Sequence, residues 1–176
     1  MIEKMKIKTW QIITILVCII LGILLHFAYE WSGQNMIIGL FSAINESTWE
    51  HLKLVFYPMI LMAIIGYFFI RRKSYNYWFA QTLGITTAIV FIIIFFYTYT
   101  GIIGTNYDWL NIAIFIIAIL LGEYVTYKVL TTSKIYDTEA VSKFFLIILF
   151  FSFMLYTFSP PEIQLFQDPI TGRFGI

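Results

Sequence analysis

Five long apolar stretches constrain most strongly what this chain can fold into. They lie at about residues 9–29, 49–70, 78–100, 109–130 and 141–158. A helix that crosses a hydrocarbon core of ~30 Å needs about 20 mostly apolar residues, and each stretch reaches that length, the fifth only just. The strands of a membrane β-barrel would alternate apolar and polar residues, and these stretches do not. The sequence therefore predicts an all-α, polytopic membrane bundle of five transmembrane helices.

Composition agrees with a single transmembrane domain over residues 1–176. The chain is 60% hydrophobic and 12% charged, whereas soluble domains carry about 25% charged residues. A net charge of +1, with basic residues clustered only beside the spans, argues against a nucleic-acid partner. The single cysteine, Cys18, excludes an internal disulfide. We expect the lipid bilayer as the main partner and no nucleotide cofactor.

The basic residues predict an orientation. Nine of the eleven lysines and arginines flank one side of the predicted spans: Lys4, Lys6, Lys8, Arg71, Arg72, Lys73, Lys128, Lys134 and Lys143. Because cytoplasmic segments carry the excess of lysine and arginine, the N-terminus is predicted inside the cell and the C-terminus outside. The first apolar run is too long for a signal peptide and lacks a small-residue cleavage site, so we expect it to be retained. These features predict a multi-pass protein of the cell membrane.

A polar segment stands out against this background on the predicted outer side. Seven residues hold two carboxylates, an imidazole, an amide and two hydroxyls: Asn45, Glu46, Ser47, Thr48, Trp49, Glu50 and His51. His26 and Glu30, spaced i, i+4, share one face at the outer end of the first helix, and a short hairpin brings them near this segment. Ionisable groups are costly at membrane depth, so their clustering is a site hypothesis by default.

Part of this segment has an ordinary explanation as a helix start. Ser47 to Glu50 fits the capping box, in which the serine caps the helix and the glutamate reaches back. Asn45 is the alternative cap. Capping accounts for Ser47 and Glu50, but it leaves Glu46 and His51 without a role. A purely structural network of helix caps and a functional site both remain open.

The functional interpretation is a metal or proton site. Imidazole and carboxylate groups bind zinc and related ions, and the candidates are His26, Glu30, Glu46, Glu50 and His51. Neighbours on a helix point about 100° apart, so Glu50 and His51 would share one ion only on irregular backbone. His51 is therefore either a ligand or a donor behind the ligands. The cofactor prediction is a divalent metal ion, although the spacing matches no standard zinc motif such as HExxH.

Three further polar residues are candidates for supporting roles. Lys53 either pairs with Glu50 or extends to the outer interface. Glu123 lies inside the fourth span, where a carboxyl should face the bundle interior and be protonated or hydrogen-bonded. It is either a structural partner or one step of a proton path. Asp168 belongs to a tail, residues 159–176, that carries both turn chemistry and apolar side chains. We expect the tail to fold over the outer face, where Asp168 would complete the site; the alternative is a loosely ordered end.

Several motifs resemble those of one family. They are HxxxEWSG at 26–33, GLFS at 39–42, NESTWEHLK at 45–53, and a PP pair at 160–161 followed by LFxDPxTG at 165–172. Together they resemble an uncharacterised family, a domain of unknown function, of small multi-pass membrane proteins from Gram-positive bacteria. The resemblance covers nearly the whole chain. It implies the same spans and the same polar residues, and it brings no activity with it.

Three functions are consistent with the sequence. The leading one is a binding or transport protein whose outward-facing His/Glu site takes a divalent cation or a proton, with Glu123 as a deeper relay. Five spans are few for a transport path in one chain, which favours a homodimer. The alternative is a membrane-embedded, metal-dependent hydrolase or transferase acting on lipid, in which a glutamate activates a metal-bound water. The third is a structural or partner subunit without chemistry of its own.

Overall fold

The chain forms a bundle of helices. The computed structural model describes residues 2–74, 76–134 and 138–175. Its elements are α1 (Ile2–Trp31), α2 (Met36–Gly39), α3 (Thr48–Ile70), η1 (Arg71–Lys73), α4 (Tyr77–Ile103), α5 (Asp108–Leu130), α6 (Glu139–Phe158) and η2 (Gln164–Phe166). Across these described ranges the only β-structure is one isolated bridge, between Gln167 and Phe174. The all-α prediction is confirmed.

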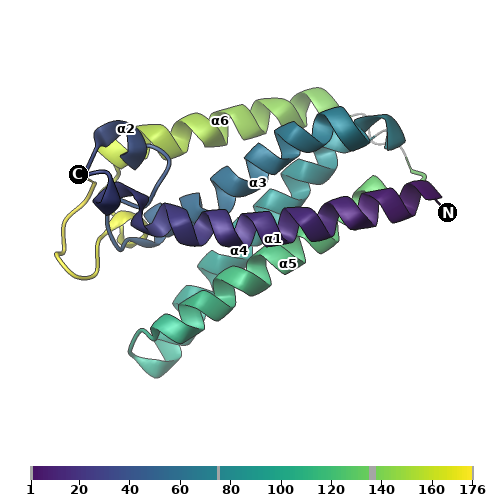
Figure 1. The fold of residues 1–176 in the computed structure, drawn as a ribbon. Helices are drawn as coiled ribbons and strands as arrows, with labels where there is room; N and C mark the ends of the chain where they lie inside the picture. Colours follow the sequence, from purple (N-terminus) through teal and green to yellow (C-terminus); the bar gives the residue numbers. More distant parts are fainter. Residues whose placement is uncertain (1, 75, 135–137, 176) are drawn as a thin grey trace.

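Five of these helices are long and apolar enough to cross a membrane. They are Lys6–Trp31 within α1, together with α3, α4, α5 and α6, and their mean hydropathy lies between 1.9 and 2.7. They cover the five apolar stretches of the sequence. Successive long helices run in alternating directions through the bundle (Figure 1), so the basic segments at residues 71–73 and 131–134 lie toward the end that holds the N-terminus.

The core of the bundle surrounds α3. This helix is buried along most of its span, whereas α1 and α6 expose most of theirs. Leu52, Val55 and Phe56 are fully buried, and the apolar residues of α3 point to all sides. A helix that is hydrophobic all round is expected either at the centre of a bundle or in contact with lipid, and α3 takes the central place.

Two glycine contacts bring the helices close together. A Cβ on Gly84 of α4 would lie 2.6 Å from the carbonyl oxygen of Gly122 in α5, and the reverse contact would be 2.7 Å. A Cβ on Gly22 of α1 would lie 2.7 Å from the carbonyl oxygen of Leu54 in α3. That carbonyl lacks its usual helical donor because residue 58 is proline, which has no N–H. Small residues allow this close packing of apolar helices.

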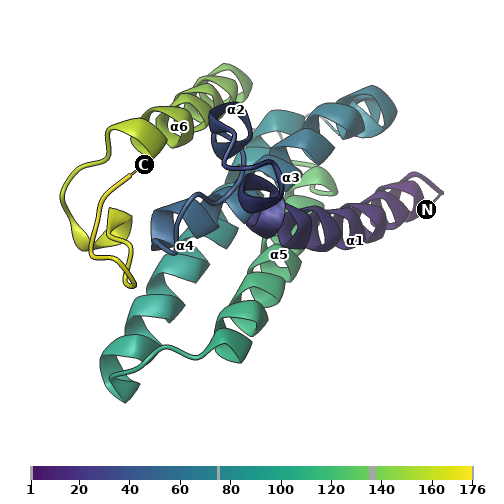
Figure 2. The ribbon, with the colours of Figure 1, turned by 60° about the vertical axis from the view of Figure 1, so that its left-hand side comes forward.

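The loop after α1 and the C-terminal tail lie at the same end of the bundle, opposite the N-terminus (Figures 1 and 2). We call it the loop end; it comprises residues 32–47 and 159–175. The Asn45 side chain donates a hydrogen bond from Nδ2 to the carbonyl oxygen of Gly175 at 3.1 Å. Phe166 is buried, and its ring centroid lies 4.7 Å from that of Trp49. The tail is thereby joined to the beginning of α3.

Candidate functional site

The polar segment of residues 45–51 lies where the loop enters α3. Ser47 is the N-cap, and its Oγ accepts a hydrogen bond from the Glu50 N–H at 3.3 Å. In a complete capping box the Ser47 N–H would donate to the Glu50 carboxylate. Here the Ser47 N–H donates to Asn45 Oδ1 at 3.0 Å instead, and the Glu50 carboxylate accepts from the Ile44 N–H at 3.1 Å. The helix therefore begins after Glu46, and Glu46 and Glu50 do not share a helix face.

Three of the predicted side chains converge at this end of α3. His26 of α1, Glu46 of the loop and His51 of α3 each offer one ligand atom, and these atoms lie within 4.8 Å of one another. His51 Nε2 is 3.4 Å from Glu46 Oε2, and the two imidazole centroids are 5.3 Å apart. Ligands bound tetrahedrally about 2.0–2.1 Å from a zinc ion lie roughly 3.4 Å from each other. The trio thus needs only small side-chain rotations to hold one ion.

The hydrogen bonding of His51 suits a metal ligand. Its Nδ1 lies 2.9 Å from the carbonyl oxygen of Ser47, and a carbonyl only accepts hydrogen bonds, so Nδ1 carries a proton. Nε2 faces Glu46, so in the neutral ring its lone pair would be available to a cation bound between the two side chains. Metal-binding histidines are commonly oriented in this way, by a backbone carbonyl on the second ring nitrogen.

His26 leaves one polar atom without a partner. Its Nδ1 is buried and has no hydrogen-bond partner within the described ranges, while its ring packs edge-on against Phe27 at 4.8 Å between centroids. A buried polar atom left unpaired costs about 1–3 kcal/mol. Such an atom calls for an explanation, and a bound ion or an ordered water is the usual one.

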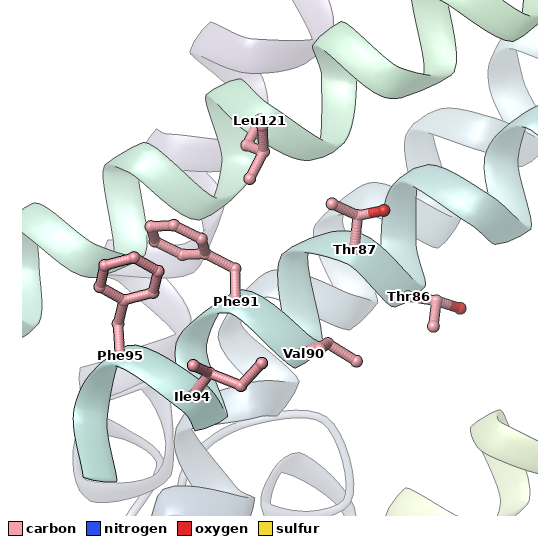
Figure 3. Close-up of a pocket in the computed structure, with 7 residues that line it drawn as sticks. All are labelled: Thr86, Thr87, Val90, Phe91, Ile94, Phe95 and Leu121. Atoms are coloured by element: carbon pink, nitrogen blue, oxygen red, sulfur yellow. The ribbon is translucent and has the colours of Figure 1, made fainter. Parts of the chain in front are cut away.

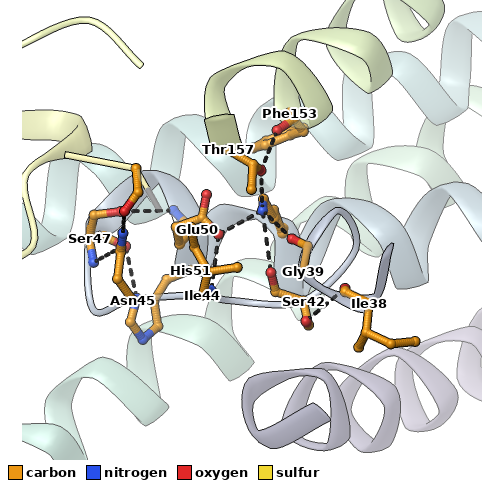
Figure 4. A network of polar contacts seen from close by, with 12 residues as sticks. Ile38, Gly39, Ser42, Ile44, Asn45, Ser47, Glu50, His51, Phe153 and Thr157 are labelled. Carbon is orange, nitrogen blue, oxygen red and sulfur yellow. Dashed lines mark hydrogen bonds and ion pairs between the residues drawn. The ribbon is translucent and has the colours of Figure 1, made fainter. Parts of the chain in front are cut away.

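The Glu50 carboxylate lies outside the trio and binds Lys53 in the polar network of Figure 4, which also reaches His51 through Ser47. The ammonium nitrogen of Lys53 lies 2.6 Å from Glu50 Oε2, and the two side chains are 0% and 2% exposed. Lys53 also donates to the carbonyl oxygens of Gly39 at 2.9 Å and Ser42 at 3.3 Å, and to Thr157 Oγ1 at 2.5 Å. The network joins α3 to the loop and to α6. Of the two alternatives for Lys53, the structure has the ion pair.

The remaining sequence candidates lie outside the trio. Glu30 is exposed on α1, one turn beyond His26. Asp168 serves the turn of the tail, with Oδ1 accepting from the Ile170 N–H at 3.0 Å and Oδ2 from Thr171 Oγ1 at 2.6 Å.

Glu123 is buried in α5 and interacts electrostatically with Cys18 of α1. Cys18 precedes His26 by eight residues, or about 12 Å along α1, so this part of the bundle lies apart from the trio.

Thr157 is the network residue that sequence reasoning missed. Its hydroxyl accepts from Lys53 and donates to the carbonyl oxygen of Phe153 at 2.9 Å, and the residue is fully buried. The signal available in the sequence was a threonine near the end of the mostly apolar fifth span, where Ser152 and Tyr156 carry hydroxyls as well. Its partner is 104 residues away in the chain, so no local pattern identifies the pair.

A groove lies elsewhere, along α4 and α5 (Figure 3). Its lining is apolar except for two threonines, and consists of Thr86, Thr87, Val90, Phe91, Ile94, Phe95 and Leu121. None of the site candidates lines it. The trio lies instead at the loop end, where the Glu46 side chain is 45% exposed and that of His51 is 33% exposed.

Comparison with known proteins shows the family to which the chain belongs. No curated protein and no solved structure matches this chain. A family model described as "Family of unknown function (DUF6512)" matches residues 1–176, so the expected membership of an uncharacterised family over the length of the chain is confirmed. The chain belongs to DUF6512, a family of unknown function.

Proposed function

We propose that this protein is an integral membrane protein that binds a divalent transition-metal ion through His26, Glu46 and His51. The observation that carries the proposal is their convergence within 4.8 Å from a helix, a loop and a second helix. The oriented His51 ring and the unpaired His26 Nδ1 support it. Glu50 is given no ligand role, because its carboxylate is occupied by Lys53.

The ligand set favours zinc and its neighbours over magnesium or calcium. Two imidazoles and one carboxylate suit ions of intermediate hardness, whereas magnesium and calcium prefer oxygen ligands alone. Three protein ligands leave the fourth tetrahedral position to water, as in catalytic rather than structural zinc sites. The exposed side of Glu46 would give such a water access to solvent.

The site would face the outside of the cell. Five helices have the length and hydropathy of membrane spans, and nine of the eleven basic residues flank their opposite ends. The positive-inside rule then assigns those ends to the cytoplasm and the loop end to the outer surface. We propose the cell membrane of a Gram-positive bacterium as the location.

Isothermal titration of the purified full chain in detergent tests the metal proposal. We expect zinc to bind with a stoichiometry near one ion per chain, and binding to be lost in His51→Ala and strongly weakened in Glu46→Gln. Glu30→Gln is the matched control, because it removes a carboxylate one turn from His26 that lies outside the trio; its binding should equal wild type. Zinc, manganese and calcium titrations that show no more binding than a His26→Ala/His51→Ala variant would overturn the proposal.

The open coordination position favours a second candidate, metal-assisted hydrolysis of lipid. A zinc-bound water is a nucleophile at neutral pH, and the trio lies at the end of α1 where lipid headgroups would be. Incubation of zinc-loaded protein with phospholipid vesicles, followed by mass spectrometry of the lipids, separates the two functions. Products that form with wild type and not with His51→Ala indicate the enzyme. Their absence, together with bound zinc, leaves binding alone, or transport by a homodimer.

A further inference from the structure

Glu123 is a buried carboxyl that the metal site does not use. It lies in α5, about 22 Å along the helix from Asp108 and about 10 Å from Leu130, at 1.5 Å per residue. It is 2% exposed. Its Oε2 atom has no hydrogen-bond partner in the part of the chain that the structure describes. A buried carboxyl with an unpartnered oxygen at this depth of an apolar helix is unusual and costly.

A polar face of α1 lies opposite Glu123. Gln11, Thr14 and Cys18 follow one another at helical spacing and are all buried. Gln11 donates from Nε2 to the backbone carbonyl of Glu123 at 3.4 Å, and Cys18 interacts with the Glu123 carboxyl electrostatically. Between them, Thr14 Oγ1 is a second buried atom without a partner in the described ranges. The packed helices α1 and α5 thus each carry a buried side-chain oxygen without a partner in the described ranges.

The surroundings offer Glu123 no counter-charge. The titratable groups that interact with it are Cys18 of α1 and Tyr77 of α4, and the Tyr77 hydroxyl donates to the carbonyl oxygen of Ala63. Lys128, five residues further along α5, is exposed and lies over the Tyr124 ring at 5.3 Å. On the α3 side, a Cβ built on the neighbouring Gly122 would meet the methyl group of Met59 at 3.1 Å. Among the described residues Glu123 forms no ion pair.

Glu50 is a useful comparison for Glu123, because it is a buried carboxylate with a charged partner and a hydrogen-bond donor. It is as buried as Glu123, at 2% exposure, but it lies 2.6 Å from a lysine and accepts a backbone hydrogen bond. Glu123 has neither a lysine nor a donor to its Oε2 atom. Because an isolated ionised carboxylate is far more costly to bury than a neutral acid, the two sites favour opposite charge states.

We propose that Glu123 is a proton-binding site, occupied by a proton at neutral pH, in the half of the bundle away from the His26–Glu46–His51 trio. The bound proton makes the side chain a neutral acid that an apolar layer tolerates. Loss of the proton would place a negative charge between α1 and α5. The proposal is independent of metal binding at the loop end, and it gives the protein a second ligand, the proton, at a different depth.

Infrared spectroscopy of the full chain tests this directly. The protein is purified in a detergent without ester or carboxyl groups, and the C=O band of protonated carboxylic acids is recorded at neutral pH in H₂O and D₂O. We expect a band in wild type that shifts in D₂O and disappears completely in Glu123→Gln. Glu30→Gln is the control: Glu30 is exposed and lies on α1 away from Glu123, so the band should remain.

Two results would overturn the proposal. Either the band is missing from wild type, or it persists unchanged in Glu123→Gln. If Glu123→Gln does not purify, Glu123→Asp gives the same assignment, because it moves the frequency of the band instead of removing it.

Discussion

The side chains of the adjacent residues Glu50 and His51 reach different partners, and the reason is helical geometry. Their side chains leave α3 about 100° apart, so Glu50 reaches Lys53 while His51 reaches Glu46 and His26. The same backbone segment therefore supplies a buried ion pair and a half-exposed ligand set. The ion pair holds the loop that carries Glu46, since Lys53 also binds the carbonyl oxygens of Gly39 and Ser42.

Removing Lys53 should destabilise the fold strongly. Lys53→Met leaves Glu50 buried without its partner, and breaking such a pair typically costs about 3–5 kcal/mol. The double variant Glu50→Leu/Lys53→Met removes both charges and should recover most of that loss, because an apolar pair of similar volume replaces the ion pair. Thermal unfolding in detergent measures both. A melting temperature of Lys53→Met equal to wild type would contradict this account.

At the scale of single residues, the sequence predicts contacts between residues that are close together in the chain. The Ser47 cap and the Glu50–Lys53 pairing, three residues apart, follow from short-range patterns. The expected hydrogen bond from the Ser47 N–H to Glu50 is not formed, because Lys53 and the Ile44 N–H bind the Glu50 carboxylate instead. The contacts of Lys53 with Thr157 and of Asn45 with Gly175 join distant segments, and no local pattern encodes them.

The helices are held together at a few close contacts. Apolar side chains gain little by leaving lipid for a neighbouring helix, so tight packing at small residues decides which helices pair. In this bundle Gly84 and Gly122 bring α4 and α5 together, beside the position of Glu123. Hydropathy predicts that these helices exist and roughly where they lie, although α1 begins at Ile2 and not near residue 9, and α4 continues to Ile103 and not to residue 100. It does not predict which of them are neighbours, because a helix that is apolar all round presents no preferred face.

A larger residue at Gly84 should separate α4 from α5. A Cβ there would lie 2.6 Å from the carbonyl oxygen of Gly122 and would also meet Thr126 Oγ1, and a backbone oxygen cannot rotate away. We expect Gly84→Val to cost at least the roughly 1–3 kcal/mol of ordinary overpacking, seen as a lower melting temperature. Gly101→Ala, in the same helix with open space around the new Cβ, should be neutral or slightly stabilising. Equal melting temperatures for the two variants would show that the helices do not depend on this contact.

Two of the polar groups in the described ranges lie at different depths of the molecule. The trio and the Lys53 network lie at the loop end, and Glu123 and Gln11, joined by a hydrogen bond, lie inside the bundle toward the N-terminal end. The sequence predicts both depths from the positions of these residues within their spans. It does not predict that Glu46 and His51 would join His26 while Glu50 and Glu30 would not, because that choice depends on where α3 begins and how the loop returns to it.

The orientation of the molecule decides which compartment each group serves, and cysteine labelling tests it. Basic residues flank the ends of the spans opposite the loop end, so the α4–α5 loop should be outside and the α5–α6 loop inside. In a Cys18→Ala background, which removes the single natural cysteine, exposed positions Thr105 and Ser133 are each replaced by cysteine. A membrane-impermeant maleimide should label Thr105→Cys in intact cells and Ser133→Cys only after permeabilisation. The reverse pattern would place the trio in the cytoplasm, where it would bind an ion from the cell interior instead of from the medium.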